Sequence, residues 1–168
     1  SGISHAGFML MTLLSISTSA GNLLYYASAY SLAGIAAFSV ILYVCKNRDN
    51  EDVVNFHGLA KTNPLLAAIL TGALLSMAGI PIFSGFFAKL ILFNQTIQAG
   101  YLVVVIAAVI NSIISVGYYF KLILAMYTKE ANETRTGTPI LIYTVAVVAI
   151  VLNIALGIFP SLVLDLLK

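Results

Sequence analysis

Five long apolar runs, separated by short polar segments, dominate the pattern of the chain. A membrane-spanning helix needs about 20 mostly apolar residues to cross roughly 30 Å of hydrocarbon. The runs predict an all-α transmembrane chain with five membrane-spanning helices. Their expected ranges are about 3–19, 23–45, 64–98, 101–127 and 139–158.

Polar segments mark the expected ends of these helices. A Ser-Ala-Gly-Asn sequence at 19–22 predicts a short break, and the stretch 46–61 predicts an exposed loop. A second charged loop is expected at 128–138. Pro160 follows the last run and predicts the end of the final helix, because proline cannot continue the hydrogen-bond ladder.

The third run is too long for one straight crossing. At 1.5 Å per residue, its length of about 35 residues corresponds to roughly 50 Å. Gly79, Pro81 and Gly85 lie near its middle, and these residue types interrupt or relax a helix. The sequence therefore predicts a discontinuous helix, broken at Gly79–Pro81. Broken backbone at membrane depth is tolerated only beside protein or a hydrated cavity, so this helix is expected to be an inner, functional one.

Composition excludes a soluble globule. Hydrophobic residues make up 61% of the chain and charged residues 8%, against roughly 25% charged residues in soluble domains. The net charge of +2 is too small and scattered for nucleic-acid binding. A single cysteine excludes an intrachain disulfide. Nucleotide, zinc and haem motifs are absent, so no catalytic residue, metal or cofactor is expected in this chain.

The basic residues predict an orientation. Six of the eight lie near the two charged loops: Lys46, Arg48, Lys61, Lys121, Lys129 and Arg135. The turns expected at the opposite side carry none. By the positive-inside rule, both loops face the cytoplasm and the C-terminus lies on the outer side. The chain starts without Met and at once in apolar sequence, which predicts the C-terminal part of a longer polytopic protein whose upstream half is missing.

Lys89 is the charged residue deepest inside a predicted span. A lysine in the bilayer centre costs about 2.5–3.5 kcal/mol on insertion scales, and such residues mark proton relays and ion paths. The sequence therefore predicts that Lys89 carries protons beside the helix break. The alternative is a lysine whose long stem reaches the membrane surface from a lipid-facing position.

Other polar residues within the spans are weaker candidates for a proton path. His5 titrates near neutral pH, and Lys121 could serve either as an interface anchor or as the inner end of a path. Hydroxyl and amide side chains inside the helices could connect such groups through water, although each is also typical of helix packing. These are Tyr26, Ser28, Tyr30, Ser31, Ser76, Ser84, Asn111, Ser112 and Ser115. None of the spans contains an acidic residue that could pair with Lys89.

Four segments resemble one membrane-protein family. The opening SGISHAGF resembles the "SSISHxGY" start of a late helix in the antiporter-like membrane subunits of respiratory complex I. LSMAGIP at 75–81, followed by GFFAK at 85–89, is similar to that family's "LSLAGIPxxxGFxxK" signature in a discontinuous twelfth helix. YYFK at 118–121 and GIFP at 157–160 are similar to weaker features of the last helices. Within the family, His5 favours the N-type subunit over the M and L types, and Lys89 disfavours the M type.

The resemblance implies a role in proton translocation. It implies a fragment of a 14-helix antiporter-like fold in the bacterial inner membrane, within NADH:quinone oxidoreductase. Flavin, iron–sulfur clusters and quinone would belong to partner subunits, and this chain would be a non-redox part of the enzyme. Lys89 would release a proton outward, with neighbouring antiporter-like subunits and lipid as partners.

Two other functions share these sequence features. One is a membrane subunit of a multisubunit cation/proton antiporter, which has the same helix signature. The other is a structural membrane scaffold in which Lys89 extends to the membrane surface.

Overall fold

The computed structural model describes residues 1–14, 19–46, 48, 50–130 and 140–161, which are helical or irregular, with no strand among them. The elements are α1 (Gly2–Leu10), the 3₁₀ turn η1 (Met11–Leu14), α2 (Ser19–Cys45), the 3₁₀ turn η2 (Val53–Phe56), α3 (Leu59–Thr62), α4 (Pro64–Ala78), α5 (Ser84–Gln98), α6 (Leu102–Thr128) and α7 (Ile140–Ile158).

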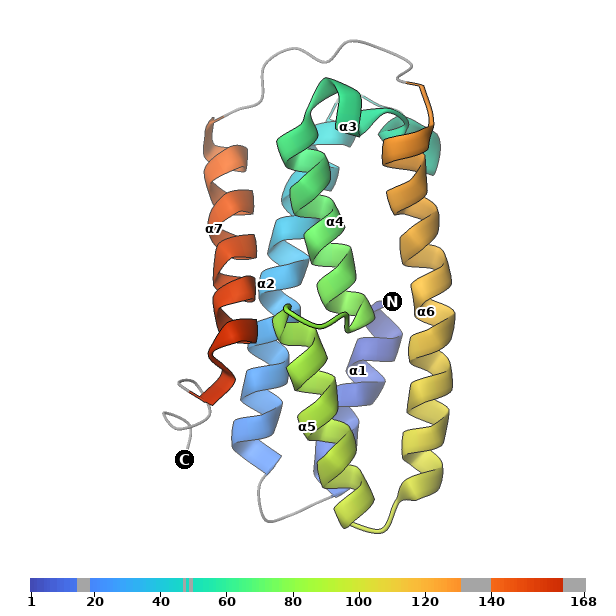
Figure 1. Ribbon diagram of the computed structural model, residues 1–168, viewed down its shortest axis with the longest axis vertical. Coiled ribbons are helices and arrows are strands. Elements are labelled where there is room, and N and C mark those ends of the chain that lie inside the picture. Colours follow the sequence, from blue (N-terminus) through green and yellow to red (C-terminus); the bar gives the residue numbers. More distant parts are fainter. Residues whose placement is uncertain (15–18, 47, 49, 131–139, 162–168) are drawn as a thin grey trace.

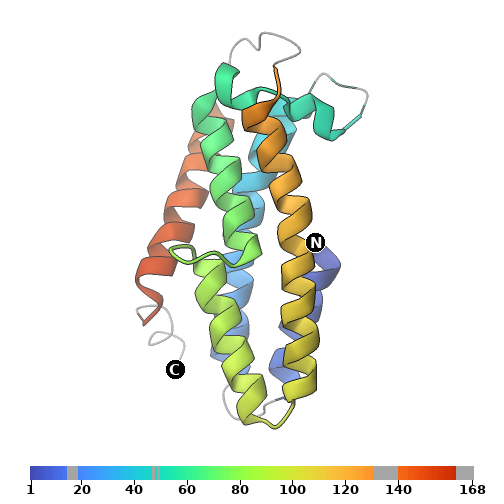
Figure 2. The ribbon, with the colours of Figure 1, turned by 45° about the vertical axis from the view of Figure 1, so that its right-hand side comes forward.

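The helices form an elongated bundle (Figure 1). α2 and α6 run along most of its length, while α4 and α5 follow one another along a shared direction. α7 lies beside α2. α1 lies beside the half of the bundle that contains α5, and the first residue is level with the gap between α4 and α5. The turned view keeps this arrangement and places the end of α2, α3, the end of α6 and the start of α7 at one end of the bundle (Figure 2).

Three helical segments are long and apolar enough to cross a membrane. They are Ala20–Cys45, Leu102–Thr128 and Ile140–Ile158, and the shorter apolar helices are Gly2–Leu14 and Pro64–Ala78. The predicted all-helical class is confirmed for the described residues. α6 and α7 begin and end within one residue of the predicted ranges. A count of five crossings remains a prediction.

The long third helix is interrupted. α4 ends at Ala78 and α5 begins at Ser84, so the predicted break is present. Gly79 has a φ of +88°, and its N–H and that of Ile80 both donate to the carbonyl of Leu75. This is the left-handed closure that glycine allows at a helix end. Pro81 follows within the connecting segment, where it prevents the helix from resuming at once.

The prediction of a break at 19–22 is wrong, because these residues form the first turn of α2. The amide of Asn22 donates to the side chain of Gln95 on α5 at 2.8 Å. A glycine inside a helix costs only about 1 kcal/mol. Packing and this interhelical bond offset that cost. The first predicted helix also differs, because α1 gives way to η1 after Leu10, and 15–18 lie outside the described residues.

The stretch 46–61 is not simply an exposed loop. It contains η2 and the start of α3, and the side chains of Phe56 and Leu59 are buried in the main core. The N–H of Gly58, which has a φ of 64°, donates to the carbonyl of Ala125 on α6. Burial of these two apolar side chains holds the polar segment against the bundle. The second predicted loop lies mostly outside the described residues.

Candidate functional site

Lys89 lies in the second turn of α5 and is 6% exposed. Its ammonium nitrogen Nζ donates to the carbonyl oxygens of Met77 at 2.9 Å and Ala78 at 3.0 Å. It also donates to the hydroxyl of Ser112 on α6 at 3.2 Å. None of these partners is a carboxylate, so the charge is held only by neutral oxygens.

The interrupted helix explains why these carbonyls are available. The last carbonyls of a helix have no intrahelical donor. At the end of α4, Gly79 and Ile80 satisfy the earlier carbonyls of Leu75 and Ser76. Lys89 Nζ donates to the two that remain, the carbonyls of Met77 and Ala78. Helical side chains lean toward the N-terminus of their own helix, so a lysine six residues into α5 reaches back across the break. The negative end of the α4 dipole also favours a cation there.

Close backbone contact fixes the start of α5 against α4. The N–H of Gly85 donates to the hydroxyl of Ser76 at 3.3 Å. A Cβ at position 85 would lie only 1.9 Å from the carbonyl oxygen of Ser76, so only glycine fits. Ser84 is fully buried beside it, and its hydroxyl has no hydrogen-bond partner among the described residues. The glycine and the two serines that the sequence indicated therefore meet at the break.

His5 lies at the same level of the bundle, in a group of aromatic residues. It is 5% exposed, and its Nδ1 lies 2.9 Å from the hydroxyl of Tyr26. Its Nε2 lies 3.4 Å from the hydroxyl of Tyr119, which also pairs with the Ser1 hydroxyl. The ring of Tyr30 stacks on the imidazole at 4.4 Å between centroids. His5 is thus a buried group rather than a histidine that faces lipid headgroups.

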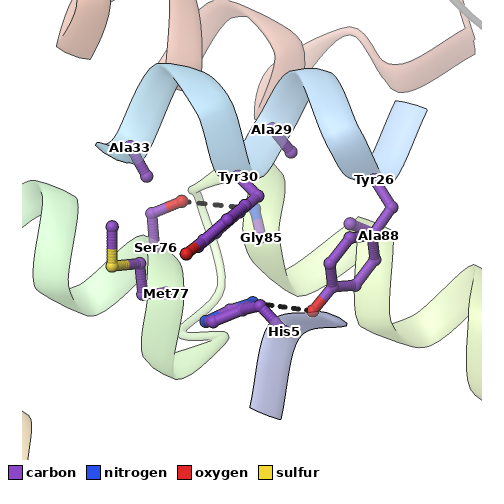
Figure 3. Close-up of a pocket in the computed structure, with 9 residues that line it drawn as sticks. All are labelled: His5, Tyr26, Ala29, Tyr30, Ala33, Ser76, Met77, Gly85 and Ala88. Carbon is purple, nitrogen blue, oxygen red and sulfur yellow. Dashed lines mark hydrogen bonds between the residues drawn. The ribbon is translucent and has the colours of Figure 1, made fainter. Parts of the chain in front are cut away.

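A small cavity separates His5 from the helix break. Figure 3 shows the residues that line it, among them His5, Tyr30, Ser76 and Gly85. Its volume is about 10 Å³, close to the least that holds one water molecule. Phe8 is near both titratable groups, with its ring centroid 5.2 Å from Lys89 Nζ and 5.9 Å from the His5 ring.

A larger cavity lies on the α6 side of Lys89. Its volume is about 290 Å³, and it opens at the surface of this chain. Gly79, Lys89 and Ser112 line it together with the aromatic residues Phe86 and Phe93. Lys89 therefore lies between the compact aromatic group around His5 and a space open enough for several water molecules.

The remaining predicted site residues are not part of this group. Ser28 and Lys121 are exposed on α2 and α6. Asn111 accepts a hydrogen bond from Ser4 at 3.3 Å, and the Ser115 hydroxyl donates to its own helix at the carbonyl of Ser112, at 2.6 Å. Asn111 is turned about 100° around the α6 axis from Ser112, toward Ser4. Ser115 shares the face of Ser112 but its hydroxyl bonds within its own helix.

Of the polar candidates indicated by the sequence, the structure brings Ser112 to Lys89 and Tyr30 to His5. Sequence reasoning missed Tyr119 as a contact of His5. A signal for Tyr119 exists, because positions 112, 115 and 119 follow a three-and-four spacing that places them on one helix face. No cluster of three or more metal-binding side chains occurs among the residues that the structure describes.

Residues 1–115 match the family described as NADH:quinone oxidoreductase/Mrp antiporter, TM. The chain belongs to this family. The match includes both α4 and α5, the break between them and Ser112. Membership also agrees with the apolar helices and makes the chain part of an integral membrane protein.

Bacterial relatives are similar over the whole chain. The chain is 81% identical to NADH-quinone oxidoreductase subunit N of Flavobacterium johnsoniae over 168 residues, which are 100% of this chain and 36% of that protein. It is 41% identical to the protein of the same name from Cytophaga hutchinsonii, over 99% of this chain and 37% of that protein. The chain thus spans little more than a third of the length of the relatives it matches.

Two solved structures share the fold. Respiratory complex I from Thermus thermophilus with bound aureothin matches with a TM-score of 0.85 and 33% identity, covering 96% of this chain and 37% of the matched chain. The Mrp complex from a Dietzia species matches with a TM-score of 0.84 and 23% identity, over 96% of this chain and 39% of that one. The second likeness concerns the fold alone.

Proposed function

We propose that this chain is the C-terminal part of a proton-translocating subunit of the N type in an NADH:quinone oxidoreductase, and that Lys89 holds and releases the transported proton. One observation carries the proposal: the amine of Lys89 is buried at a helix break with only neutral partners. Without a carboxylate beside it, the ammonium gains no ion-pair stabilisation, so small changes in nearby charge can shift its protonation.

The surroundings of Lys89 support a relay over a snorkelling lysine. A snorkelling side chain keeps its ammonium in water at the membrane surface. Lys89 Nζ instead donates to the end of α4, near the middle of the bundle's length. His5 and Tyr26 are joined by a hydrogen bond, and Phe8 contacts both the His5 ring and Lys89 Nζ, so this pair is a candidate to exchange protons with Lys89.

In the proposed subunit, α4 and α5 together form one interrupted crossing. With α2, α6, α7 and the segment that includes α1, they make five crossings within a 14-helix fold. The proposed orientation places Lys46, Lys61 and Lys129 on the cytoplasmic side, where a positive bias is usual. NADH oxidation and quinone reduction, with their flavin and iron–sulfur cofactors, belong to partner subunits, and other antiporter-like subunits are the neighbours in the membrane.

The test replaces Lys89 in the full-length subunit within the assembled complex. In proteoliposomes with matched complex content, Lys89→Ala should abolish most proton pumping and slow coupled quinone reduction. Lys89→Arg should also fail, because a guanidinium keeps its proton at any accessible pH. Lys61→Ala, at the exposed end of α3, is the matched control and should pump normally. Full pumping by Lys89→Ala would contradict the proposal.

A cation/proton antiporter subunit is the second candidate, favoured by the family description and by the fold shared with the Mrp complex. Purification of the full-length protein distinguishes the two. Co-purification with NADH-oxidising subunits supports the oxidoreductase, whereas co-purification with antiporter subunits alone supports the antiporter.

A further inference from the structure

Lys89 uses all of its hydrogen-bond donors. A lysine ammonium has three N–H bonds, and the three partners are the carbonyls of Met77 and Ala78 and the hydroxyl of Ser112. A water molecule can therefore take a proton from Nζ directly only if one of these bonds breaks first. Any proton that leaves along an existing hydrogen bond passes to one of these three oxygens.

Only one of the three partners can pass a proton onward. A backbone carbonyl accepts hydrogen bonds but has no proton to give, whereas a serine hydroxyl both accepts and donates. Ser112 Oγ lies 3.2 Å from Nζ. It is half-buried, and it forms part of the wall of the 290 Å³ cavity that also reaches Lys89. Ser112 thus stands between the buried amine and a space well above the least volume that holds one water molecule.

We infer that Ser112 is the relay through which Lys89 delivers its proton to water in this cavity. The inference rests on the proposed function of Lys89 and adds the direction of release. An N–H bond of the ammonium breaks as a new O–H bond forms on Ser112 Oγ. The original hydroxyl proton of Ser112 passes to a cavity water, which becomes hydronium. The neutral amine then has a lone pair, which accepts a hydrogen bond from the new O–H of Ser112.

This arrangement gives Ser112 a role in both charge states of Lys89. With the ammonium, Ser112 accepts a hydrogen bond, and with the neutral amine it donates one. The two carbonyl contacts need no change, because the neutral amine keeps two N–H bonds. The break between α4 and α5 can then stay capped while the proton leaves.

The experiment compares three variants of Ser112 in the full-length subunit of the assembled complex, reconstituted in proteoliposomes. The number of protons pumped per NADH oxidised and the pumping rate in H₂O and in D₂O are measured for each. Ser112→Ala should lower the pumping rate roughly tenfold, a smaller loss than the roughly 10²- to 10⁴-fold effect of a direct acid–base group, because water can enter the vacated space. Ser112→Thr keeps the hydroxyl and should restore most of the rate. Ser112→Cys keeps a similar volume but has only a weak donor, so its pumping rate should fall between those of the alanine and threonine variants. It replaces the alanine variant in the comparison if that variant does not assemble.

Ser39→Ala is the matched control, because its hydroxyl donates only to its own helix, at the carbonyl of Ile35. It should leave both the rate and the solvent isotope effect unchanged. An alanine variant of Ser112 that pumps as fast as this control, or a threonine variant as slow as alanine, would overturn the relay. If Lys89→Ala abolishes pumping in the same preparations, only the relay fails. If Lys89→Ala also pumps fully, the proposed function fails as well.

Discussion

The ammonium nitrogen of Lys89 lies 2.9 Å from the carbonyl oxygen of Met77, across the break that separates their helices. The same side chain therefore caps the end of α4 and carries the charge proposed to move. Loss of a hydrogen bond to a charged group costs about 1.5–3 kcal/mol. Substitution of Lys89 is expected to loosen the break as well as to remove the proton carrier, which is why complex content must be matched in its test.

Gly85→Ala should prevent α4 and α5 from packing end to end. The added Cβ would lie 1.9 Å from the carbonyl oxygen of Ser76, and backbone atoms cannot easily move away. Overpacking of this kind costs about 1–3 kcal/mol. We expect less assembled complex in membranes, measured by native gel and immunoblot. Gly34→Ala, where a Cβ would meet no atom within 4 Å, is the control and should assemble normally.

Gly157→Ala should disturb the break from the α7 side. A Cβ there would lie 2.2 Å from the carbonyl oxygen of Ile82 and 2.7 Å from the N–H nitrogen of Ser84. Ile82 already has a φ of +90°, which is strained for a β-branched residue. The segment therefore has little room to adjust. We expect a lower midpoint of thermal inactivation of quinone reduction than in the Gly117→Ala control. An unchanged midpoint would show that α7 does not hold the break.

Tyr26→Phe should misorient His5. It removes the hydroxyl that lies 2.9 Å from Nδ1, a bond worth about 1 kcal/mol. That energy corresponds to a several-fold loss in the population of the correctly placed imidazole. Proton pumping should fall by about that factor. Tyr143→Phe loses a comparable bond of 2.8 Å to Asn63 at the far end of the bundle, and it should pump normally. Equal rates for the two variants would argue against a role for His5.

Labelling of single cysteines tests the orientation. After replacement of Cys45 by serine, cysteines at Asn50 and Glu130 should react with a membrane-impermeant maleimide from the cytoplasmic face only. A cysteine at Gly100, in the turn between α5 and α6, should react from the opposite face. The positive-inside rule gives this expectation. Labelling of Asn50 and Glu130 from different faces would refute the proposed crossings.

The break and the long apolar helices were predictable because their causes are local. Gly79 and Pro81 change the backbone wherever they occur, and α6 and α7 follow from the length of their apolar runs. Residues 19–22 and 46–61 were mispredicted because their outcome depends on distant partners. Asn22 is held by Gln95, and Phe56 is buried in a core built from other helices.

The sequence alone determined that this chain is a set of membrane helices with a lysine just after a helix break. Apolar run length, glycine, proline and a single deep charge suffice for that, since each acts within a few residues of itself. Only the tertiary structure decided what Lys89 touches. Its contacts with Met77, Ala78 and Ser112 depend on how the start of α5 packs against the end of α4 and on the rotation of α6 about its axis. Those relationships arise from packing between helices far apart in the chain, which no local pattern specifies.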